Sequence, residues 1–316
     1  MKEIGGYFEL EQYNGSEYYP HALAVNCGRN AAVMLAVLRD YKKIYLPDFM
    51  CSSVKQALID HNIDYEIYSV SDDLNPFFDK SLSDNEAIYI VNYYGQLRDK
   101  ITDYKQKWKN VIFDNTQDFF YSSDIVDCIY TCRKFFGVAD GGYVTLSSYC
   151  NTQEYNKLPI DFSFDRMRFV LGRFEKNASE FYKEASDDNH IFIGQPILKM
   201  SKLTHNLLRS IDYESVKRIR TDNFSCLHNR LSAINEFRAI KLIDGAFMYP
   251  LRIKQGNDLR KELQQRKIYV PKLWPDVEHM GIANKLADEI VPLPCDQRYT
   301  IDDMEYIADQ IYSILG

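Results

Sequence analysis

The chain has 316 residues, of which 46% are hydrophobic and 26% charged, and these fractions are typical of a soluble globular protein. Its length allows one large core with a smaller lobe, or two modest domains. The formal net charge of -7 argues against a general nucleic-acid binder, because a phosphate backbone requires a basic face.

The apolar residues and the cysteines predict neither a targeting segment nor a membrane span. The first 15 residues contain no apolar core of the kind that a signal peptide needs, and the longest apolar run, residues 31–38, is too short to cross a bilayer. Seven scattered cysteines, an odd number, suit reduced thiols in the cytoplasm better than a disulfide framework. Cys128 and Cys132 lie four apart without a second pair or a nearby histidine, so we expect no metal site.

Short runs of β-branched and aromatic residues alternate with helical segments over roughly the first half of the chain. Runs typical of buried strands lie at residues 43–46, 65–68, 87–91 and 111–113. Helical spacing is found at 31–41, 52–61 and 100–109, and two further strands, 125–131 and 142–146, are separated by only a loop. This alternation predicts a mostly parallel sheet with helices on both faces, which binds its ligands at the carboxyl ends of its strands.

The pattern becomes helical after about residue 160 and is then mixed. Helical segments are expected at 163–185 and 213–237, the second as one long helix. The later elements are expected to be strands at 248–253 and 267–270 around a helix at 258–266, then a strand at 290–293 and a helix from Thr300. We therefore expect a large domain over residues 1–224 and a small α+β domain over residues 225–316.

Residues 26–30 open the helix expected at 31–41 and contain a candidate anion site. Gly28 permits a tight turn, and the first turn of a helix presents unpaired backbone N–H groups that bind phosphate. Arg29 would add a charged donor. An ordinary helix start, capped by Asn26 or Asn30, explains the same residues.

Two chemically active side chains follow strands at their carboxyl ends. Asp114 comes directly after the strand at 111–113, where a carboxylate either points into a ligand crevice or caps a turn. Lys134 follows the strand at 125–131. A lone lysine is usually a surface residue, but an amine flanked by Arg133 and apolar residues can have its pKa lowered, which is what a Schiff-base lysine needs.

The order of these features resembles the DegT/DnrJ family of sugar-nucleotide aminotransferases, which use pyridoxal 5'-phosphate (PLP). That family has a glycine-containing phosphate turn, a D-x-x-Q motif after a strand, and a lysine seven residues before a Gly-Gly pair. Asp114 and Gln117 match the motif, and Lys134 has the family's spacing to Gly141 and Gly142. The segments GGYFELE near the start, VNYYGQ at 91–96 and VPLPCDQRYTIDDM before the last helix also resemble members, so the likeness covers nearly the whole chain.

The resemblance implies the type I PLP-transferase fold, an α/β fold. It has a mostly parallel sheet of the seven-stranded type, helices on both faces, and a smaller C-terminal α+β domain. Lys134 would hold PLP as a Schiff base and then move a proton between substrate and cofactor. Asp114 would pair with the pyridine nitrogen, and Gln117 would approach the phenolic oxygen. The residues implied for the phosphate are Gly28, Arg29 and Asn30, with Thr131.

The family also implies substrates and a partner. An amino-acid donor, expected to be glutamate, would leave its nitrogen on the cofactor, and a keto-sugar nucleotide would collect it. Polysaccharide biosynthesis is the expected setting. Active sites of this fold form between two subunits, so we expect a homodimer in which residues 160–210 supply groups to the neighbouring site.

Three departures from the family pattern stand out. The place of the aromatic residue that stacks on the cofactor is taken by Cys51, which leaves Phe49 as a candidate substitute. The serine expected five residues before the lysine is Ile129, so phosphate binding would depend on Thr131 and Arg29. The chain is also shorter than typical members, with the loss after the Gly-Gly pair, where the family shapes its substrate pocket.

Other interpretations keep part of this picture. A relative that lost catalysis and acts as a binding or regulatory protein would explain the altered stacking and phosphate positions, although it has no need of Lys134, Asp114 and Gln117 together. A nucleotide-dependent transferase would require a phosphate turn with several glycines, where this chain has only Gly28. Sugar dehydratases of the same family replace the lysine by histidine, so Lys134 favours transamination.

Overall fold

The computed structural model describes residues 4–237, 239–275, 277 and 281–316. The elements up to the last strand of the large sheet are β1 (Leu23–Val25), α1 (Gly28–Arg39), β2 (Lys43–Pro47), α2 (Ser52–Asp60), β3 (Asp64–Val70), β4 (Pro76–Phe77), β5 (Glu86–Val91), the 3-10 helices η1 (Tyr93–Gly95) and η2 (Arg98–Lys100), α3 (Ile101–Lys107), β6 (Val111–Asp114), β7 (Asp127–Thr131) and β8 (Gly142–Thr145). The later elements are α4 (Gln153–Lys157), η3 (Phe164–Arg166), α5 (Arg168–Glu175), α6 (Ala178–His190), α7 (Lys202–Leu208), α8 (Tyr213–Leu231), β9 (Met248–Arg252), α9 (Gly256–Gln265), α10 (Ile282–Glu289), β10 (Ile290–Pro294) and α11 (Ile301–Leu315).

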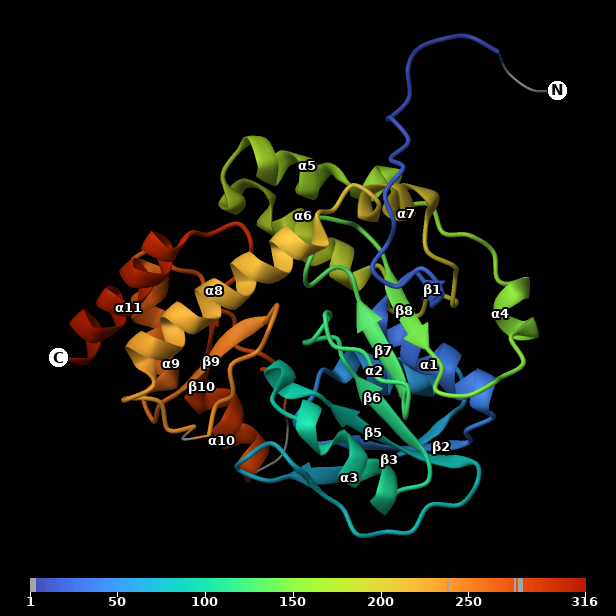
Figure 1. Ribbon diagram of the computed structural model, residues 1–316, viewed down its shortest axis with the longest axis horizontal. Helices are drawn as coiled ribbons and strands as arrows, with labels where there is room; N and C mark the ends of the chain where they lie inside the picture. Colours follow the sequence, from blue (N-terminus) through green and yellow to red (C-terminus); the bar gives the residue numbers. More distant parts are fainter. Residues whose placement is uncertain (1–3, 238, 276, 278–280) are drawn as a thin grey trace.

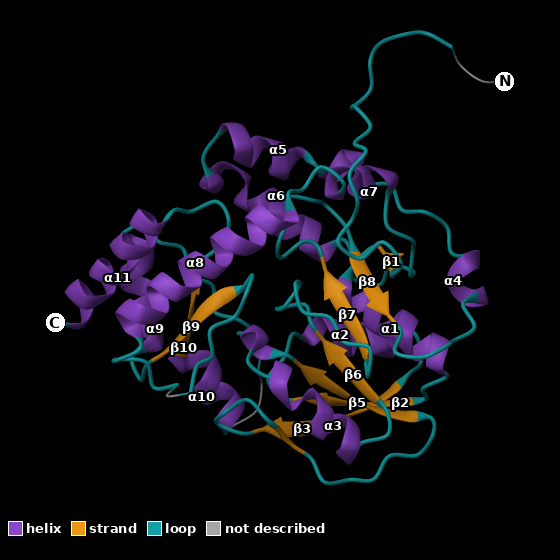
Figure 2. Cartoon of the chain, viewed as in Figure 1, coloured by secondary structure: helices purple, strands orange, loops and turns teal. Residues whose placement is uncertain are grey.

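Eight strands form one sheet in the order β1-β8-β7-β6-β5-β2-β3-β4 (Figure 2). The five strands from β7 to β3 run parallel, whereas β8 is antiparallel to both β7 and β1. The short β4 pairs antiparallel with the end of β3. The expected fold class is therefore confirmed, with β4 as a two-residue addition at the edge of a mostly parallel sheet of seven longer strands.

The central strands are apolar along nearly their whole length because both faces of the sheet are covered. Every residue of β5 after Glu86 is buried, and so are all four residues of β6. In Figure 1, α1 and α2 lie behind the sheet and α3 lies in front of it. The carboxyl ends of β2, β5, β6 and β7 consequently meet at one edge, where their parallel direction aligns them.

A second apolar cluster lies in the C-terminal part of the chain. There β9 and β10 form an antiparallel pair that contacts α8 and α9, and α11 packs on α8 and α9 in turn (Figure 1). The hydroxyl of Thr300 caps α11 as the sequence predicts, with Asp303 completing a capping box. α10 packs against β3 and belongs to the larger cluster, so it joins this part to the sheet.

One expected strand is wrong. Residues 267–270 follow α9 as a loop. The helix closes with Lys267 in the left-handed region (φ 62°), and the Ile268 N–H donates a hydrogen bond to the Leu263 carbonyl at 2.9 Å. Two of the residues that suggested a strand, Ile268 and Val270, pack into the C-terminal cluster from this loop, whereas Tyr269 between them is exposed.

Two expected helices differ in extent. The segment 163–185 is divided between η3, α5 and α6, because Asn177 starts α6 with a capping box to Glu180. The helix expected at 213–237 ends at Leu231, and Asn235 beyond it is buried and donates to the Pro250 carbonyl at 2.9 Å. The expected boundary between residues 224 and 225 falls inside α8, and the division into two domains stays a prediction.

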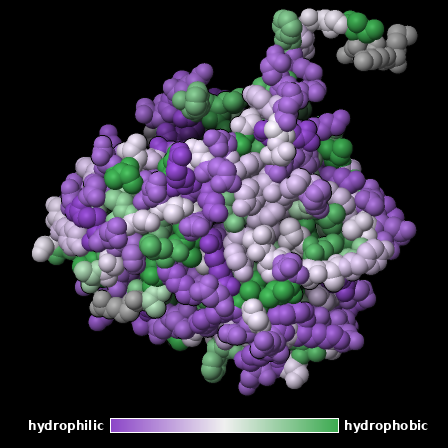
Figure 3. All heavy atoms as spheres, in the orientation of Figure 1, coloured by the Kyte–Doolittle hydropathy of each residue, from purple (hydrophilic) through white to green (hydrophobic). Residues whose placement is uncertain are grey.

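The described residues contain no helix long and apolar enough to cross a membrane. Polar residues cover most of the face shown in Figure 3, with scattered apolar patches. The N-terminal segment extends away from the body of the molecule (Figure 1), and Tyr7 and Phe8 on it are fully exposed.

Candidate active site

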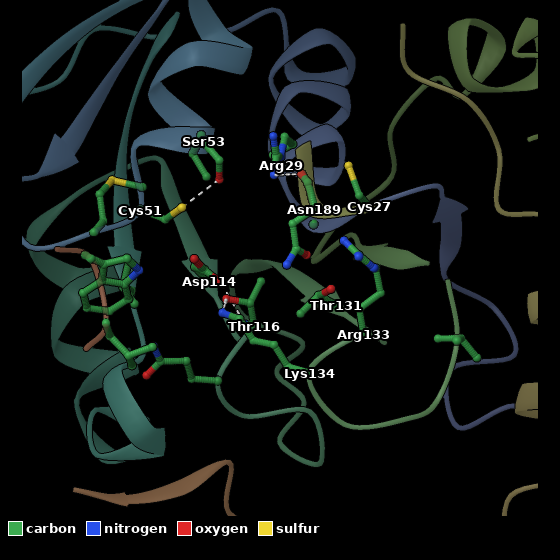
Figure 4. A pocket seen from close by; sticks show the side chains of 18 of the residues that line it. Cys27, Arg29, Cys51, Ser53, Asp114, Thr116, Thr131, Arg133, Lys134 and Asn189 are labelled. Atoms are coloured by element: carbon green, nitrogen blue, oxygen red, sulfur yellow. Dashed lines mark hydrogen bonds between the residues drawn. The ribbon is translucent and has the colours of Figure 1, made fainter. Parts of the chain in front are cut away.

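A cavity of about 630 Å³ opens at the edge where the parallel strands end. Its walls come from the loops after β2, β6 and β7, from the start of α1, from α5 and α6, and from Leu273 and Trp274 in the loop after α9. Figure 4 shows Asp114 and Thr116 at its centre, Cys51 and Ser53 on one side, and Arg29, Asn189 and Arg133 on the other. Lys134 lies beside Thr116 in the same view.

Lys134 is positioned by a tight turn directly after β7. The N–H groups of Phe135 and Phe136 both donate to the Cys132 carbonyl, at 3.0 and 2.9 Å. The Lys134 amine donates to the Thr116 hydroxyl at 3.2 Å and lies 5.5 Å from the centre of the Phe247 ring. Solvent reaches this side chain through the cavity, but the protein atoms around the amine lower the pKa of Lys134, against the opposing effects of Asp114 and Cys51. A lysine in this state supplies a neutral, nucleophilic amine more readily than a surface lysine does.

Asp114 is the last residue of β6 and is held by two hydrogen bonds. The Tyr89 hydroxyl donates to one carboxylate oxygen and the Thr116 N–H to the other, each at 2.7 Å. Burial, and then the nearby Asp114 carboxylate, raises the pKa of Tyr89 well above its usual value, so the phenol remains a donor. These bonds fix a buried carboxylate at the centre of the cavity, where it can pair with a cationic group of a ligand.

Gln117 contributes a donor that the protein itself does not use. Its side-chain oxygen accepts a hydrogen bond from the Tyr94 N–H at 2.9 Å, which fixes the orientation of the amide. Its nitrogen is buried and has no hydrogen-bond partner among the described residues. An unsatisfied buried donor is costly, so a ligand oxygen in the cavity is its natural partner.

The start of α1 forms another part of the wall. Cys27 occupies the N-cap position rather than Asn26 or Asn30, and Gly28 and Arg29 of the first turn line the cavity. A Cβ on Gly28 would lie only 3.3 Å from the Cβ of Thr131, so glycine lets the helix start approach β7 closely. This geometry favours an anion at the helix N-terminus, beside the Thr131 hydroxyl.

Most of the site residues expected from the sequence meet here, but two do not. Lys134, Asp114, Gln117, Gly28, Arg29, Cys51 and Thr131 all line the cavity. Asn30 is buried away from it, and its amide donates to the side chain of Asn26 at 2.8 Å. Phe49 is also buried behind the wall, where it packs on Tyr93 and Trp274.

Sequence reasoning missed several residues of the cavity. Thr116, inside the D-x-x-Q motif, accepts the hydrogen bond of the lysine. Arg133 lines the cavity and donates to the buried carboxylate of Asp188 on α6, and burial lowers the pKa of Arg133 while it raises the pKa of Asp188. Trp274 arrives from a loop with no motif of its own. The sequence offered one indication of such residues, namely a position next to a recognised motif residue. Thr116 and Arg133 have such a position, and Trp274 does not.

Three features are compared with solved structures: the order of the strands in the sheet, the C-terminal apolar cluster, and a lysine in a cavity at the carboxyl ends of the strands. Solved structures with this fold include several aminotransferases. A DegT DnrJ EryC1 StrS aminotransferase from Brucella abortus is 14% identical, with a TM-score of 0.64 over 94% of this chain and 86% of its own. The sugar aminotransferase CalS13 from Micromonospora echinospora is 17% identical, with a TM-score of 0.62 over 93% of this chain and 87% of its own.

A third structure supports the same conclusion about the fold. Helicobacter pylori PseC, an aminotransferase involved in the biosynthesis of pseudoaminic acid, is 12% identical, with a TM-score of 0.65 over 93% of this chain and 86% of its own. No protein-family model and no curated protein sequence matches the chain. At these identities the likeness shows the fold alone: this chain has the fold of the sugar aminotransferases, as its sequence predicts.

Proposed function

We propose that this protein is a PLP-dependent aminotransferase that moves an amino group from an amino acid, glutamate in our proposal, to a keto-sugar nucleotide, with Lys134 as the reactive amine. The observation that carries the proposal is the meeting of Lys134, Asp114 and Gln117 in one cavity at the carboxyl edge of the sheet. Asp114 and Gln117 come from the end of β6 and the loop after it, and Lys134 comes from the loop after β7. An amine, a fixed carboxylate and a free amide donor together match the functional groups of one ligand, PLP.

The residues present fit PLP group by group. Asp114 is an acceptor for the protonated pyridine nitrogen, and its two hydrogen bonds keep it from turning away. The unpaired nitrogen of Gln117 is a donor for the phenolic oxygen. The start of α1, with Arg29 and Thr131, forms an anion site for the phosphate. Lys134 is the amine for the aldehyde carbon.

The chemistry divides between the cofactor and the chain. When bound, PLP supplies an electron-accepting ring that stabilises negative charge on the carbon that loses or gains a proton. Lys134 moves that proton between the substrate carbon and the cofactor carbon, and its lowered pKa suits an amine that must alternate between base and acid. Thr116 orients the Lys134 amine through the hydrogen bond at 3.2 Å. α5 and α6 cover one side of the cavity and limit the access of water.

The two residues that depart from the family pattern, Ile129 and Cys51, lie in different surroundings: one is buried in the sheet and the other lines the cavity. Ile129 is fully buried within β7, where it cannot contact a phosphate, and the lining residue two positions later is Thr131. Cys51 does line the cavity, with its sulfur 3.1 Å from the Ser53 hydroxyl. Arg133, which the family comparison did not suggest, adds a second guanidinium to the wall beside Arg29.

A neighbouring groove supports the assignment of a sugar nucleotide as acceptor. It has a volume of about 1340 Å³, and it shares Lys134 and Phe136 with the cavity. The groove combines guanidinium groups with aromatic rings, which suit the diphosphate and the base of a nucleotide. These residues are Arg168, Arg173 and Arg298, with Phe164, Phe174 and Tyr299.

The proposal includes a homodimer in the cytoplasm. Large apolar side chains between residues 160 and 210 are strongly exposed outside the groove, among them Phe162, Tyr182 and Ile193. A partner subunit that covers this segment would bury them and place the segment near its own cavity. All seven cysteines are unpaired, which suits a reducing compartment.

The test is the visible absorption spectrum of the purified protein with added PLP, before and after borohydride. The wild type and a Lys261→Ala control, which changes an exposed lysine of α9, should both develop a yellow band that reduction abolishes. Lys134→Ala should develop none. Peptide mapping after reduction should find the added mass on Lys134, and glutamate should bleach the band.

Failure would take two distinguishable forms. If the wild type forms no band, the cofactor assignment is wrong, and a binding or regulatory protein on the same fold becomes the better interpretation. If the band forms on Lys134 but no amino acid bleaches it, the cofactor assignment holds and transamination does not.

A further inference from the structure

The loop between α9 and α10 places a tryptophan in the cavity wall in an unusual backbone conformation. Trp274 has φ 56°, in the left-handed region that favours glycine and is rare for a bulky aromatic residue. Trp274 nevertheless lines the cavity, together with Leu273. Strained residues of this kind persist where surrounding contacts fix them, and they are concentrated at ligand sites.

The contacts that fix Trp274 are specific. Its ring lies 4.6 Å from that of Phe49 at 89° and 5.8 Å from that of Tyr93 at 71°. The loop itself is tied to α10 by an ion pair of 2.6 Å between Lys272 and Asp288. The indole is therefore held by packing on residues that follow β2 and β5, at the edge of the sheet that carries the site.

One of these supporting residues lies close to Asp114 in the sheet: Tyr93 follows Asn92, whose N–H donates to the Asp114 carbonyl at 3.0 Å. Burial is the main reason why the pKa of Tyr93 is raised well above its usual value, and the Asp114 carboxylate is among the nearby charges that add to it. Phe49 packs on Tyr93, with ring centres 5.4 Å apart. Trp274 therefore packs on the aromatic pair of Phe49 and Tyr93, close to the carboxylate that would bind the pyridine nitrogen.

At the position of Cys51 the cavity wall offers no aromatic ring to a planar ligand, and Phe136 and Phe169 line the cavity from the loop after β7 and from α5. Cys51 faces the cavity opposite Arg29 and Asn189 in Figure 4, and a thiol offers little flat surface. Tyr89 also lines the cavity, but it is fully buried and its hydroxyl is engaged by Asp114. Trp274 is only partly buried, so its indole keeps surface available to a ligand.

We propose that the indole of Trp274 is the aromatic surface on which the cofactor ring lies, at the place that Cys51 leaves without a ring. This inference rests on the proposed function. The indole face is rich in electron density, and a pyridine ring protonated against Asp114 is poor in it, so the two stack favourably. Trp274 is in this sense a positioning residue, and it makes cofactor binding depend on a loop that belongs to the C-terminal part of the chain.

The chain permits a direct test because it contains only two tryptophans. The other, Trp108, is buried beside Tyr104 at the end of α3 and does not line the cavity. Trp108→Phe leaves Trp274 as the single tryptophan, and Trp274→Phe leaves Trp108. Both proteins are titrated with PLP while indole emission and the visible band are recorded together, so that the second protein controls for absorption of light by PLP itself.

If the inference holds, the protein with Trp274 alone loses most of its emission as the band forms, and the protein with Trp108 alone loses much less. Trp274→Ala should raise the apparent Kd for PLP about three- to tenfold, and Trp274→Phe should stay within about twofold of the wild type. Near-ultraviolet and far-ultraviolet circular dichroism of the cofactor-free variants checks that they fold.

The outcomes separate this inference from the proposed function. A visible band on the wild type, with unchanged Trp274 emission or with an unchanged Kd for Trp274→Ala, overturns the role of Trp274 and leaves the PLP assignment intact. Absence of the band in the wild type overturns the proposed function, and the inference with it.

Discussion

Two sides of the cavity are built in different ways. The sheet edge, which we define as Asp114, Thr116, Gln117 and Lys134, lies within a few residues of the ends of β6 and β7. The distal wall, which we define as Phe169, Val170, Ala185, Asn189, Leu273 and Trp274, comes from α5, α6 and the loop after α9. The sheet edge is fixed by hydrogen bonds of 2.7 to 3.2 Å among its own members and Tyr89.

The difference suggests a division of labour. Groups that must be placed to within a fraction of an ångström for chemistry are found at the sheet edge, at or just after the ends of two central strands. The distal wall brings bulky and apolar side chains, which determine what fits. Substitutions at the sheet edge should therefore reduce the rate, and substitutions at the distal wall should change affinity or stability.

The largest effect is expected for Lys134→Arg. A guanidinium keeps the positive charge and much of the length but cannot form a Schiff base or give up its proton near neutral pH. We expect the half-reaction with glutamate to slow by about 10⁴-fold or more in stopped-flow absorbance. Lys261→Arg, on the exposed face of α9, should leave the rate unchanged. A rate within tenfold of the wild type would contradict the assignment of Lys134.

Asp114→Asn should have the second largest effect. The amide keeps the shape and can still accept the Tyr89 hydrogen bond, but it removes the charge that pairs with the pyridine nitrogen. We expect the rate to fall roughly 10²- to 10³-fold while the cofactor still binds. The change also removes the carboxylate that raises the pKa of Lys134, so that pKa should drop further. It can be followed by the pH dependence of PLP capture, and a rise would count against this view.

Arg133→Met tests the connection between the two sides of the cavity. The guanidinium of Arg133 pairs with Asp188 of α6, and its removal leaves a buried carboxylate whose remaining ion pair among the described residues is with Arg166, at 3.8 Å. We expect the free energy of unfolding at pH 7 to fall by about 2–3 kcal/mol in urea titrations. The control Arg168→Met, which removes a guanidinium that is mostly exposed, should cost much less.

The same variant has a predictable dependence on pH. Burial already raises the pKa of Asp188, and loss of the arginine raises it further. A carboxyl whose folded pKa lies above its unfolded value binds protons more tightly when folded, so stability rises as the pH falls through the folded pKa. The deficit of Arg133→Met should therefore shrink on acidification toward the usual range of an aspartate. A deficit that is constant between neutral pH and that range would exclude Asp188 as its cause.

Thr131→Val should have the smallest effect. It removes one hydroxyl from the proposed phosphate site and keeps the side-chain shape. We expect the apparent Kd for PLP to rise about five- to tenfold, as for the loss of one hydrogen bond to an anion, with little change in stability. Thr102→Val on the exposed side of α3 is the matched control. Equal affinity for both variants would remove Thr131 from the site.

The sheet edge could be predicted from the sequence because it depends on local order. A buried strand followed by Asp114 or Lys134 places that residue at the carboxyl edge whatever the rest of the chain does. The parallel sheet itself followed from the alternation of apolar runs, although β1 and β4, with three and two residues, were too short to recognise.

The distal wall could not be predicted in the same way. Trp274 reaches the cavity only because the loop after α9 packs on Phe49 and Tyr93, which are about 200 residues away in the chain. The buried position of Phe49 itself follows from that contact, and sequence spacing had suggested Phe49 for the cavity. The strand expected at 267–270 failed for a related reason, because tertiary packing overrode the local preference of an apolar run.

The seven cysteines of this chain differ sharply in their access to solvent. Cys27, Cys128, Cys132 and Cys295 are buried, Cys150 and Cys226 are half-buried, and only Cys51 is exposed. Cys51 lines the cavity, so a maleimide that reacts with it quickly does so at the cavity wall. Any molecule that fills the cavity should slow the alkylation of Cys51 and leave the alkylation rates of the other cysteines unchanged. The thiol count over time therefore measures what fraction of the protein has its cavity filled, without a coloured ligand or a turnover assay.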